Sequence, residues 1–427
     1  MTILIFLLAL GTGMIIGMPI AFALLAAAVA LMFQQHMFDS QIVAQNLING
    51  STSFTLMAVP FFLLAGEVMN TGGLSKRIVK VALVLVGHVR GGLGYVTIIA
   101  ACLLASLSGS AVADAAALAT LLVPMMTAAG HQRGQACGLV AAGGIIGPII
   151  PPSIPFILFG VAGGVSISKL FLAGIFPGLY MGVGLAAAWW YITRNDDVQV
   201  HEKQSIGVFL KALQEGAWAL GLPAIIIFGL KFGVFTPTEA AVVAAVYAMF
   251  VAIVIYRELK FTQIFSVLVA ATRSTGVVMF LIAAALVAAW MITIADLPGQ
   301  MVTLLQPLMG SPTLLLLAIV AILFAVGCVM DLAPIILILT PVLLPVVKQA
   351  GINEVYFGVI FIVCGSIGLI TPPVGTVLNV VAGATNSSMT RVVKDVGPFL
   401  ISHSIILLLM IFFPALVIVP AKWVGGY

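Results

Sequence analysis

The sequence carries very little charge. Only 7% of its 427 residues are Asp, Glu, Lys or Arg, whereas 63% are hydrophobic. Soluble proteins carry about 25% charged residues, so this chain lacks the material for a water-exposed surface. The composition excludes a soluble globular protein and predicts an all-α polytopic membrane protein whose surroundings are the lipid bilayer. The net charge of +4 gives no reason to expect a nucleic-acid partner, because basic residues in membrane proteins mainly report orientation.

Residues with catalytic or metal-ligand chemistry are also scarce. The four cysteines show no CxxC spacing, the five histidines are dispersed, and no P-loop is present. A membrane enzyme would need converging acid, base or metal groups. We therefore expect no catalytic residues, and keep a polytopic membrane enzyme only as the less favoured alternative. The first 33 residues also lack the basic start and small-residue cleavage site of a signal peptide, which predicts a retained span.

Two proline-broken apolar segments are the most informative feature that is present. Residues 144–152 read Gly-Ile-Ile-Gly-Pro-Ile-Ile-Pro-Pro, and residues 365–373, 221 positions later, read Gly-Ser-Ile-Gly-Leu-Ile-Thr-Pro-Pro. Consecutive prolines interrupt a helix and leave backbone groups free, which the membrane interior tolerates only inside protein or around a cavity. Interrupted segments at corresponding positions of two halves are typical of transporters. The same offset aligns Pro124 with Pro345, Gly130 with Gly351, Ser166 with Ser387 and Pro177 with Pro398.

Apolar runs near or above the length of a membrane span recur along the chain. Two further apolar regions, 92–129 and 312–348, are split by short, nearly uncharged tips at 106–110 and 327–331. We expect re-entrant helical hairpins there; the alternative is two ordinary helix pairs joined by surface loops. The expected spans are 3–33, 52–71, 135–160, 167–193, 216–235, 238–256, 262–294, 354–380 and 398–420.

The basic residues predict the orientation. With the N-terminus inside, the second half is inverted relative to the first, and the two hairpins enter from opposite sides to meet near the midplane. The outer segments then hold mainly Lys169, Lys231, Lys348 and Lys422. The cytoplasmic segments hold Lys76, Arg77, Lys80, Arg90, Arg133, Arg194, Lys203, Lys211, Arg257, Lys260, Arg391 and Lys394.

Four stretches resemble the large membrane subunit of tripartite ATP-independent periplasmic (TRAP) transporters, within the ion-transporter superfamily. They are Val59-Pro-Phe-Phe-Leu-Leu-Ala-Gly66, Ser108-Gly-Ser-Ala-Val-Ala-Asp114, Ile149-Ile-Pro-Pro-Ser153 and Gly233-Val-Phe-Thr-Pro-Thr-Glu-Ala-Ala241. The resemblance implies sodium-coupled uptake of an organic acid, such as a C4-dicarboxylate, sialic acid or another sugar acid, by an elevator mechanism in the bacterial inner membrane. It also implies a periplasmic substrate-binding protein and a small four-helix membrane subunit, which we expect to be a separate polypeptide. A sodium/anion symporter working without a binding protein is the alternative.

The chemistry at the tips and breaks suits two sodium ions, because unwound backbone carbonyls and hydroxyls supply the oxygen ligands that Na⁺ prefers. The alternative is that these small residues only let helices pack closely. The first expected site comprises Ser106, Ser108, Gly109, Ser110, Gly144, Gly147 and Pro148. The second comprises Gly327, Cys328, Val329, Met330, Gly365, Gly368 and Thr371.

Three acids, of which Asp114 and Asp331 lie nearest the tips, have two interpretations each. Asp114 and Asp331 either add negative charge to the sodium sites or stabilise the starts of the helices that follow them. For Glu239 the spacing from Thr236 and Pro237 favours a capping box at a helix start over an ion ligand.

Candidate substrate contacts lie between the two breaks. Ser153, Thr376 and Asn379 supply hydroxyl and amide groups, although Asn379 is equally suited to a bond between helices. Arg273 lies well inside the expected span 262–294, where it either pairs with a carboxylate or extends to the interface.

These assignments divide the chain into scaffold and transport segments. We expect residues 1–91 to form scaffold helices and an interfacial arm, and 92–160 to form the first hairpin and broken helix. Residues 161–311 then hold scaffold, a connecting span and the start of the inverted repeat. Residues 312–385 form the second hairpin and broken helix, and 386–427 a C-terminal scaffold helix.

Overall fold

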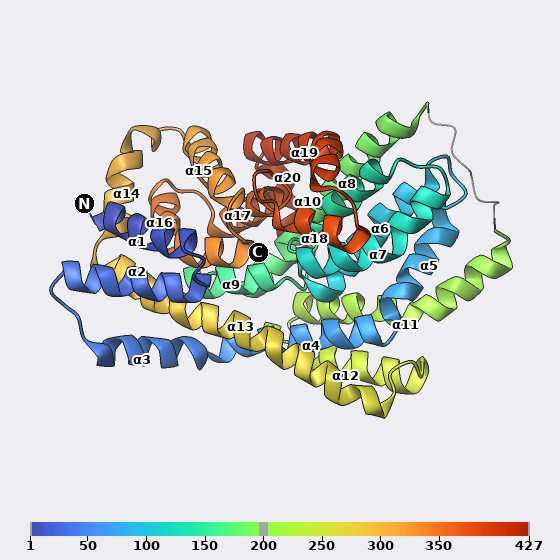
Figure 1. Cartoon of the computed structure of the whole chain (residues 1–427), viewed down its shortest axis with the longest axis horizontal. Coiled ribbons are helices and arrows are strands. Elements are labelled where there is room, and N and C mark those ends of the chain that lie inside the picture. Colours follow the sequence, from blue (N-terminus) through green and yellow to red (C-terminus); the bar gives the residue numbers. More distant parts are fainter. Residues whose placement is uncertain (1, 196–203, 426–427) are drawn as a thin grey trace.

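The computed structural model describes residues 2–195 and 204–425, and it is helical without strands over those ranges (Figure 1). Lys203, one of the basic residues expected in the cytoplasmic segments, lies outside the described residues. Eight of the described helical segments are long and apolar enough to cross a membrane. The α-helices are α1 (Thr2–Ile15), α2 (Ile20–Gln34), α3 (Ser40–Ser51), α4 (Ala58–Thr71), α5 (Leu74–Val86), α6 (Gly92–Ser108), α7 (Ala111–Ala128), α8 (Arg133–Gly144), α9 (Ile154–Gly163), α10 (Ile167–Thr193), α11 (Ile206–Lys231), α12 (Pro237–Phe250), α13 (Phe261–Ile294), α14 (Leu297–Leu305), α15 (Pro312–Gly327), α16 (Leu332–Gln349), α17 (Glu354–Gly368), α18 (Thr376–Thr385), α19 (Met389–Phe412) and α20 (Ala415–Gly425).

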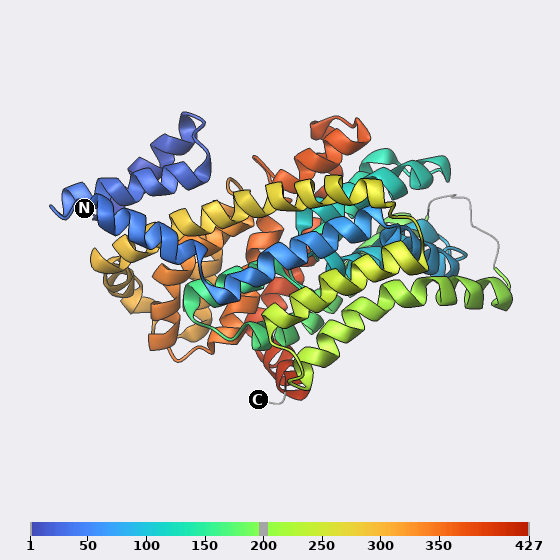
Figure 2. The same ribbon diagram turned by 90° about the horizontal axis from the view of Figure 1, so that it is seen from below.

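The N-terminal segment is a pair of helices, so the predicted single span 3–33 is wrong. Helices α1 and α2 run side by side in opposite directions (Figures 1 and 2). Gly17 has a φ of 82°, which favours glycine, and Pro19 precedes α2 with extended backbone angles. Since the chain reverses here, the predicted orientation rests on the later basic segments alone.

Both predicted hairpins are present as helix–turn–helix units, α6–α7 and α15–α16. Gly109 ends α6 with a φ of 62°, and the Ser110 hydroxyl caps α7 by accepting a bond from the Ala113 amide at 3.4 Å. In the second unit, Asp331 caps α16 by accepting from the Leu332 amide at 2.9 Å. The turn of each hairpin therefore falls inside its predicted tip. That the hairpins re-enter the membrane stays a prediction.

The two proline breaks also lie where the sequence predicts them. Helix α8 stops at Gly144 and α9 starts at Ile154, while α17 stops at Gly368 and α18 starts at Thr376. Both Pro-Pro bonds within the breaks are cis. The expected spans 135–160 and 354–380 are thus each two shorter helices around a non-helical centre.

Two later boundaries differ from prediction. Helix α11 begins at Ile206, ten residues before the expected span 216–235, because the Ser205 hydroxyl caps it at the Val208 amide. The expected span 398–420 is wrong: α19 begins at Met389, runs through Pro398 and ends at Phe412. Pro414 has no amide hydrogen, and Phe413 before it leaves the helical region, so α20 is a separate helix.

Helix α5 joins α4 to the first hairpin, within the range 1–91 where we expect an interfacial arm; that it lies at the membrane interface stays a prediction. Leu74, Ile78 and Ala82 face inward, and charged residues occupy the other side. Arg77 pairs with Glu258 at 2.7 Å and lies over the Tyr256 ring at 3.7 Å. These contacts fix the arm to the turn between α12 and α13.

The remaining helices sort into two groups by packing. Helices α2, α3 and α4 pack along the long helix α13, and α12 packs on α4 (Figure 2). Helices α8, α9, α17 and α18 instead pack among the hairpins, α10 and α19. The hairpin tips and the breaks lie where these two groups meet.

Candidate functional site

The first hairpin tip packs directly on the first helix break. A methyl group at Gly109 would lie 2.6 Å from the carbonyl oxygen of Pro152, and one at Gly144 would lie 2.6 Å from Cβ of Ala115. A methyl group at Gly147 would collide with Oδ2 of Asp114. Glycine is therefore favoured at all three positions, most strongly at Gly109, where the neighbouring atom is backbone and φ is positive.

Several oxygen atoms gather at this first junction. Asp114, in the first turn of α7, is only 4% exposed and lies against Gly147. The hydroxyl of Ser106 donates to the Leu103 carbonyl at 2.6 Å, which leaves its lone pairs as acceptors. The side chain of the predicted ligand Ser108 lies outside the described residues.

The second junction has the same arrangement. A methyl group at Gly368 would lie 2.7 Å from the Cα of Gly327, and one at Gly365 would collide with the Leu332 side chain. The Val374 amide in the break donates to the carbonyl of Cys328 in the tip at 3.2 Å. Each tip is thus held against the break of its own half, as the sequence predicts; ion binding at either junction stays a prediction.

The candidate ligands of the second site differ in exposure. Met330 is buried, while Val329 is half exposed and Cys328 is intermediate. The Thr371 hydroxyl donates to the Ile367 carbonyl at 2.8 Å, back toward its own helix. Asp331 serves as the helix cap that its sequence suggests, and this role leaves its second carboxylate oxygen available.

One small cavity of about 150 Å³ lies between the two junctions. Its walls include Gly109 and Ser110 of the first tip, Pro148 of the first break, and Asp331 of the second tip. The wall also includes Leu369 of the second break, Leu158 of α9, Leu63 of α4 and Val278 of α13. The two candidate sodium sites therefore adjoin a common space that also touches α4 and α13.

A wider cavity of about 400 Å³ adjoins the first and contains Arg273. The two cavities share Leu63, Ser110 and Val278 in their walls. Arg273 lies about three turns into α13, so it faces this cavity from within the helix rather than marking its end. Arg273 therefore lies beside the first hairpin tip, and its contact with a carboxylate stays a prediction.

Sequence reasoning missed three polar residues of this wider cavity, Glu67 and Asn70 of α4 and Ser274 of α13. Glu67 lies inside the apolar run 52–71, where an ionisable residue in a span normally faces a cavity or partner. An acid within an apolar run could therefore have been noticed in the sequence. Its position relative to Arg273 could not, because that depends on which faces of α4 and α13 pack together.

The other three predicted substrate contacts lie at the breaks and do not line these two cavities. Ser153 is fully buried; its hydroxyl donates to the Pro148 carbonyl and accepts from the Phe156 amide at 3.3 Å, so it caps α9. The side-chain amide of Asn379 donates to the Val374 carbonyl at 2.8 Å. The buried hydroxyl oxygen of Thr376 has no hydrogen-bond partner among the described residues.

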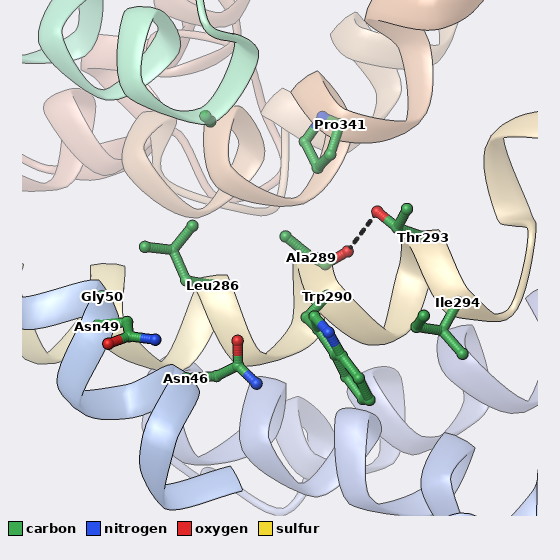
Figure 3. A pocket seen from close by; sticks show the side chains of 10 residues that line it. Asn46, Asn49, Gly50, Leu286, Ala289, Trp290, Thr293, Ile294 and Pro341 are labelled. Atoms are coloured by element: carbon green, nitrogen blue, oxygen red, sulfur yellow. Dashed lines mark hydrogen bonds between the residues drawn. The ribbon is translucent and has the colours of Figure 1, made fainter. Parts of the chain in front are cut away.

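A third cavity, of about 460 Å³, lies farther along α13 (Figure 3). One side presents Asn46 and Asn49 of α3 with Trp290 and Thr293 of α13, and Pro341 of α16 lies across from them. Helix α13 therefore borders one polar cavity at Arg273 and another at Trp290, both against the hairpin group.

Glu239 is the helix cap that its spacing predicts. Its carboxylate accepts from the Thr236 amide at 2.8 Å, and the Thr236 hydroxyl accepts from the Glu239 amide at 3.4 Å. We expect Glu239→Ala to lower the thermal stability slightly, because the backbone amide of the N-cap residue Thr236 loses its partner. Thermal unfolding in detergent measures this, with Glu239→Gln as the control that retains the cap. A changed sodium dependence with unchanged stability would contradict the capping role.

Two hairpin tips that meet two broken helices around one cavity, in a helical membrane protein, define a membrane transporter. The family model described as "Tripartite ATP-independent periplasmic transporter, DctM component" matches residues 4–416, and the chain belongs to this family.

Named relatives match most or all of the chain. It is 55% identical over 425 residues to the 2,3-diketo-L-gulonate TRAP transporter large permease protein YiaN of Escherichia coli, covering 100% of both chains. The sialic acid TRAP transporter large permease protein SiaM of Vibrio cholerae is 36% identical, with 96% of each chain covered. The YdaH transporter of Alcanivorax borkumensis has a similar fold, with a TM-score of 0.62 over 90% of this chain and 87% of that one, at 16% identity.

Proposed function

We propose that this chain is the large permease of a sodium-coupled tripartite transporter that imports a sugar-derived organic acid across the bacterial inner membrane. A periplasmic binding protein delivers the acid, and a small four-helix membrane subunit completes the complex. The observation that carries the proposal is the packing of each hairpin tip on the break of its own half, with both junctions beside one cavity.

Two sodium ions fit the two junctions. Each junction combines backbone carbonyls of a non-helical break with a carboxylate at the adjoining helix start, Asp114 in one and Asp331 in the other. Hard oxygen ligands of this kind suit Na⁺. Two sodium ions with one monoanion move one net positive charge inward, which the membrane potential favours by about 2.3 kcal/mol per 100 mV.

The wider cavity favours a substrate with one carboxylate and several hydroxyl or carbonyl groups. Arg273 provides the only positive charge among the residues that line it, and it can bind one carboxylate through two parallel bonds. Glu67 would repel a second carboxylate but can accept bonds from hydroxyls, as can Asn70. This chemistry agrees with the relatives named for 2,3-diketo-L-gulonate and sialic acid, and fits a C4-dicarboxylate less well.

Alternating access would follow from movement of the hairpin group along α13. In the present arrangement the tips face Leu63 and Val278, next to Arg273. After an elevator displacement they would face the cavity at Trp290 instead. Helices α10 and α19 pack on the broken helices, and the Tyr356 hydroxyl of α17 donates to the Met410 carbonyl of α19 at 2.9 Å. We therefore place α10 and α19 in the moving unit rather than in the scaffold that the sequence division assigns them.

Uptake of labelled 2,3-diketo-L-gulonate into proteoliposomes tests the function. The vesicles contain this chain and its small subunit, with the binding protein and a sodium gradient added singly and together. We expect uptake only when the binding protein and the sodium gradient are both present. Other sugar acids should compete strongly for uptake, and succinate only weakly. Uptake driven by sodium without the binding protein would instead support the conventional symporter, and uptake without sodium would overturn the coupling.

A further inference from the structure

Helix α19 lies against α8, the broken helix that leads to the first junction. Gly134 and Gly138 of α8 face it one turn apart, and a methyl group at Gly138 would lie 2.9 Å from the carbonyl oxygen of Asp395. Small residues at this spacing let two helices approach closely. Two turns farther along α19, His403 reaches the other end of α8.

The end of α8 leaves a carbonyl without its helical donor. In a continuing helix the Ile146 amide would donate to the Ala142 carbonyl, but here it donates to Gly143 at 3.1 Å. Nε2 of His403 lies 3.1 Å from the Ala142 carbonyl oxygen, and the imidazole is fully buried. A carbonyl can only accept, so Nε2 carries the hydrogen, and Nδ1 has no partner among the described residues.

We propose that His403 is a positioning residue for the first sodium site. By holding the Ala142 carbonyl, it fixes where α8 ends and hence the direction of the carbonyls from Gly144 to Pro148. Groups that orient ion ligands from behind commonly influence ion affinity although they never touch the ion. The inference rests on the proposed sodium coupling and refines it.

The role belongs to one site only. The offset of 221 residues that relates the two halves places Gly182 at the position corresponding to His403, and glycine has no side chain to donate. In the second half, α17 continues to Gly368 before it breaks. Loss of His403 should therefore weaken one sodium-binding step and leave the other in place.

The test compares His403→Phe and His403→Met, which remove the donor, with His403→Gln, which keeps one. Leu407→Met, one turn away on the same buried side of α19, is the packing control. Sodium is titrated against the thermal stability of the purified complex in detergent and against uptake at saturating substrate.

We expect the donor-free variants to raise the half-saturating sodium concentration about tenfold in both assays, with reduced sodium cooperativity. His403→Gln and Leu407→Met should stay within about twofold of the parent protein. Equal loss of stability with and without sodium, at an unchanged sodium midpoint, would overturn the inference, as would a tenfold change in His403→Gln. If the parent protein itself shows no sodium dependence, the proposed coupling fails first.

Discussion

Gly368→Ala should reduce sodium-driven uptake by about 10–100-fold at low sodium. The added methyl group would lie 2.7 Å from the backbone of Gly327, so the second hairpin tip and its break would have to separate. Turning a flexible side chain cannot relieve this contact, because the methyl carbon is bonded directly to Cα and the Gly327 atoms that it meets are backbone. Initial uptake rates against sodium concentration measure the effect, and we expect a higher sodium midpoint rather than a changed substrate midpoint.

Gly383→Ala is the matched control for this substitution. Gly383 lies in α18, directly beyond the same break, and a methyl group there meets nothing within 4 Å. Its uptake should remain within about twofold of the parent, since alanine in a helix is at least as favourable as glycine. Normal sodium dependence in Gly368→Ala would show that the tip–break junction is packing alone.

Arg273→Gln should raise the half-saturating substrate concentration about tenfold or more at saturating sodium. Glutamine can still donate a hydrogen bond, but it loses the charge and the paired geometry that bind a carboxylate. Arg273→Lys should have a half-saturating substrate concentration between those of the parent protein and Arg273→Gln. Initial uptake rates over a range of substrate concentrations give the measurement.

Lys260→Gln serves as the control, because Lys260 precedes the first turn of the same helix and lines none of the cavities described above. It should leave the substrate midpoint unchanged. If Arg273→Gln behaves in the same way, Arg273 merely extends toward the interface, and the wider cavity is not the substrate site.

The hairpins and breaks could be predicted because their signals are local. Consecutive prolines cannot continue a helix, and Gly109 is a helix-ending residue with a positive φ, so these features hold whatever surrounds them. The N-terminal pair was missed although Gly17 and Pro19 stand in its turn, because the apolar run on both sides is long enough to suggest one span.

The scaffold side of the site could not be predicted in the same way. The repeat pairs each tip with its own break, but it carries no information on which face of α4 or α13 meets them. Glu67 and Arg273 share a cavity only because two helices far apart in sequence pack at one particular rotation. The cap at Ser153, in contrast, depends on local sequence alone, since Ser-Ile-Pro at a helix start already suggests the cap that the structure contains.

The most direct test of the sodium account is the number of sodium ions that move with each substrate. Proteoliposomes with the full tripartite complex are set at known sodium and substrate gradients, and the membrane potential at which net flux vanishes is determined. Two candidate junctions and a monocarboxylate predict two sodium ions and one net charge per substrate. A zero-flux potential that does not respond to the sodium gradient would contradict the account.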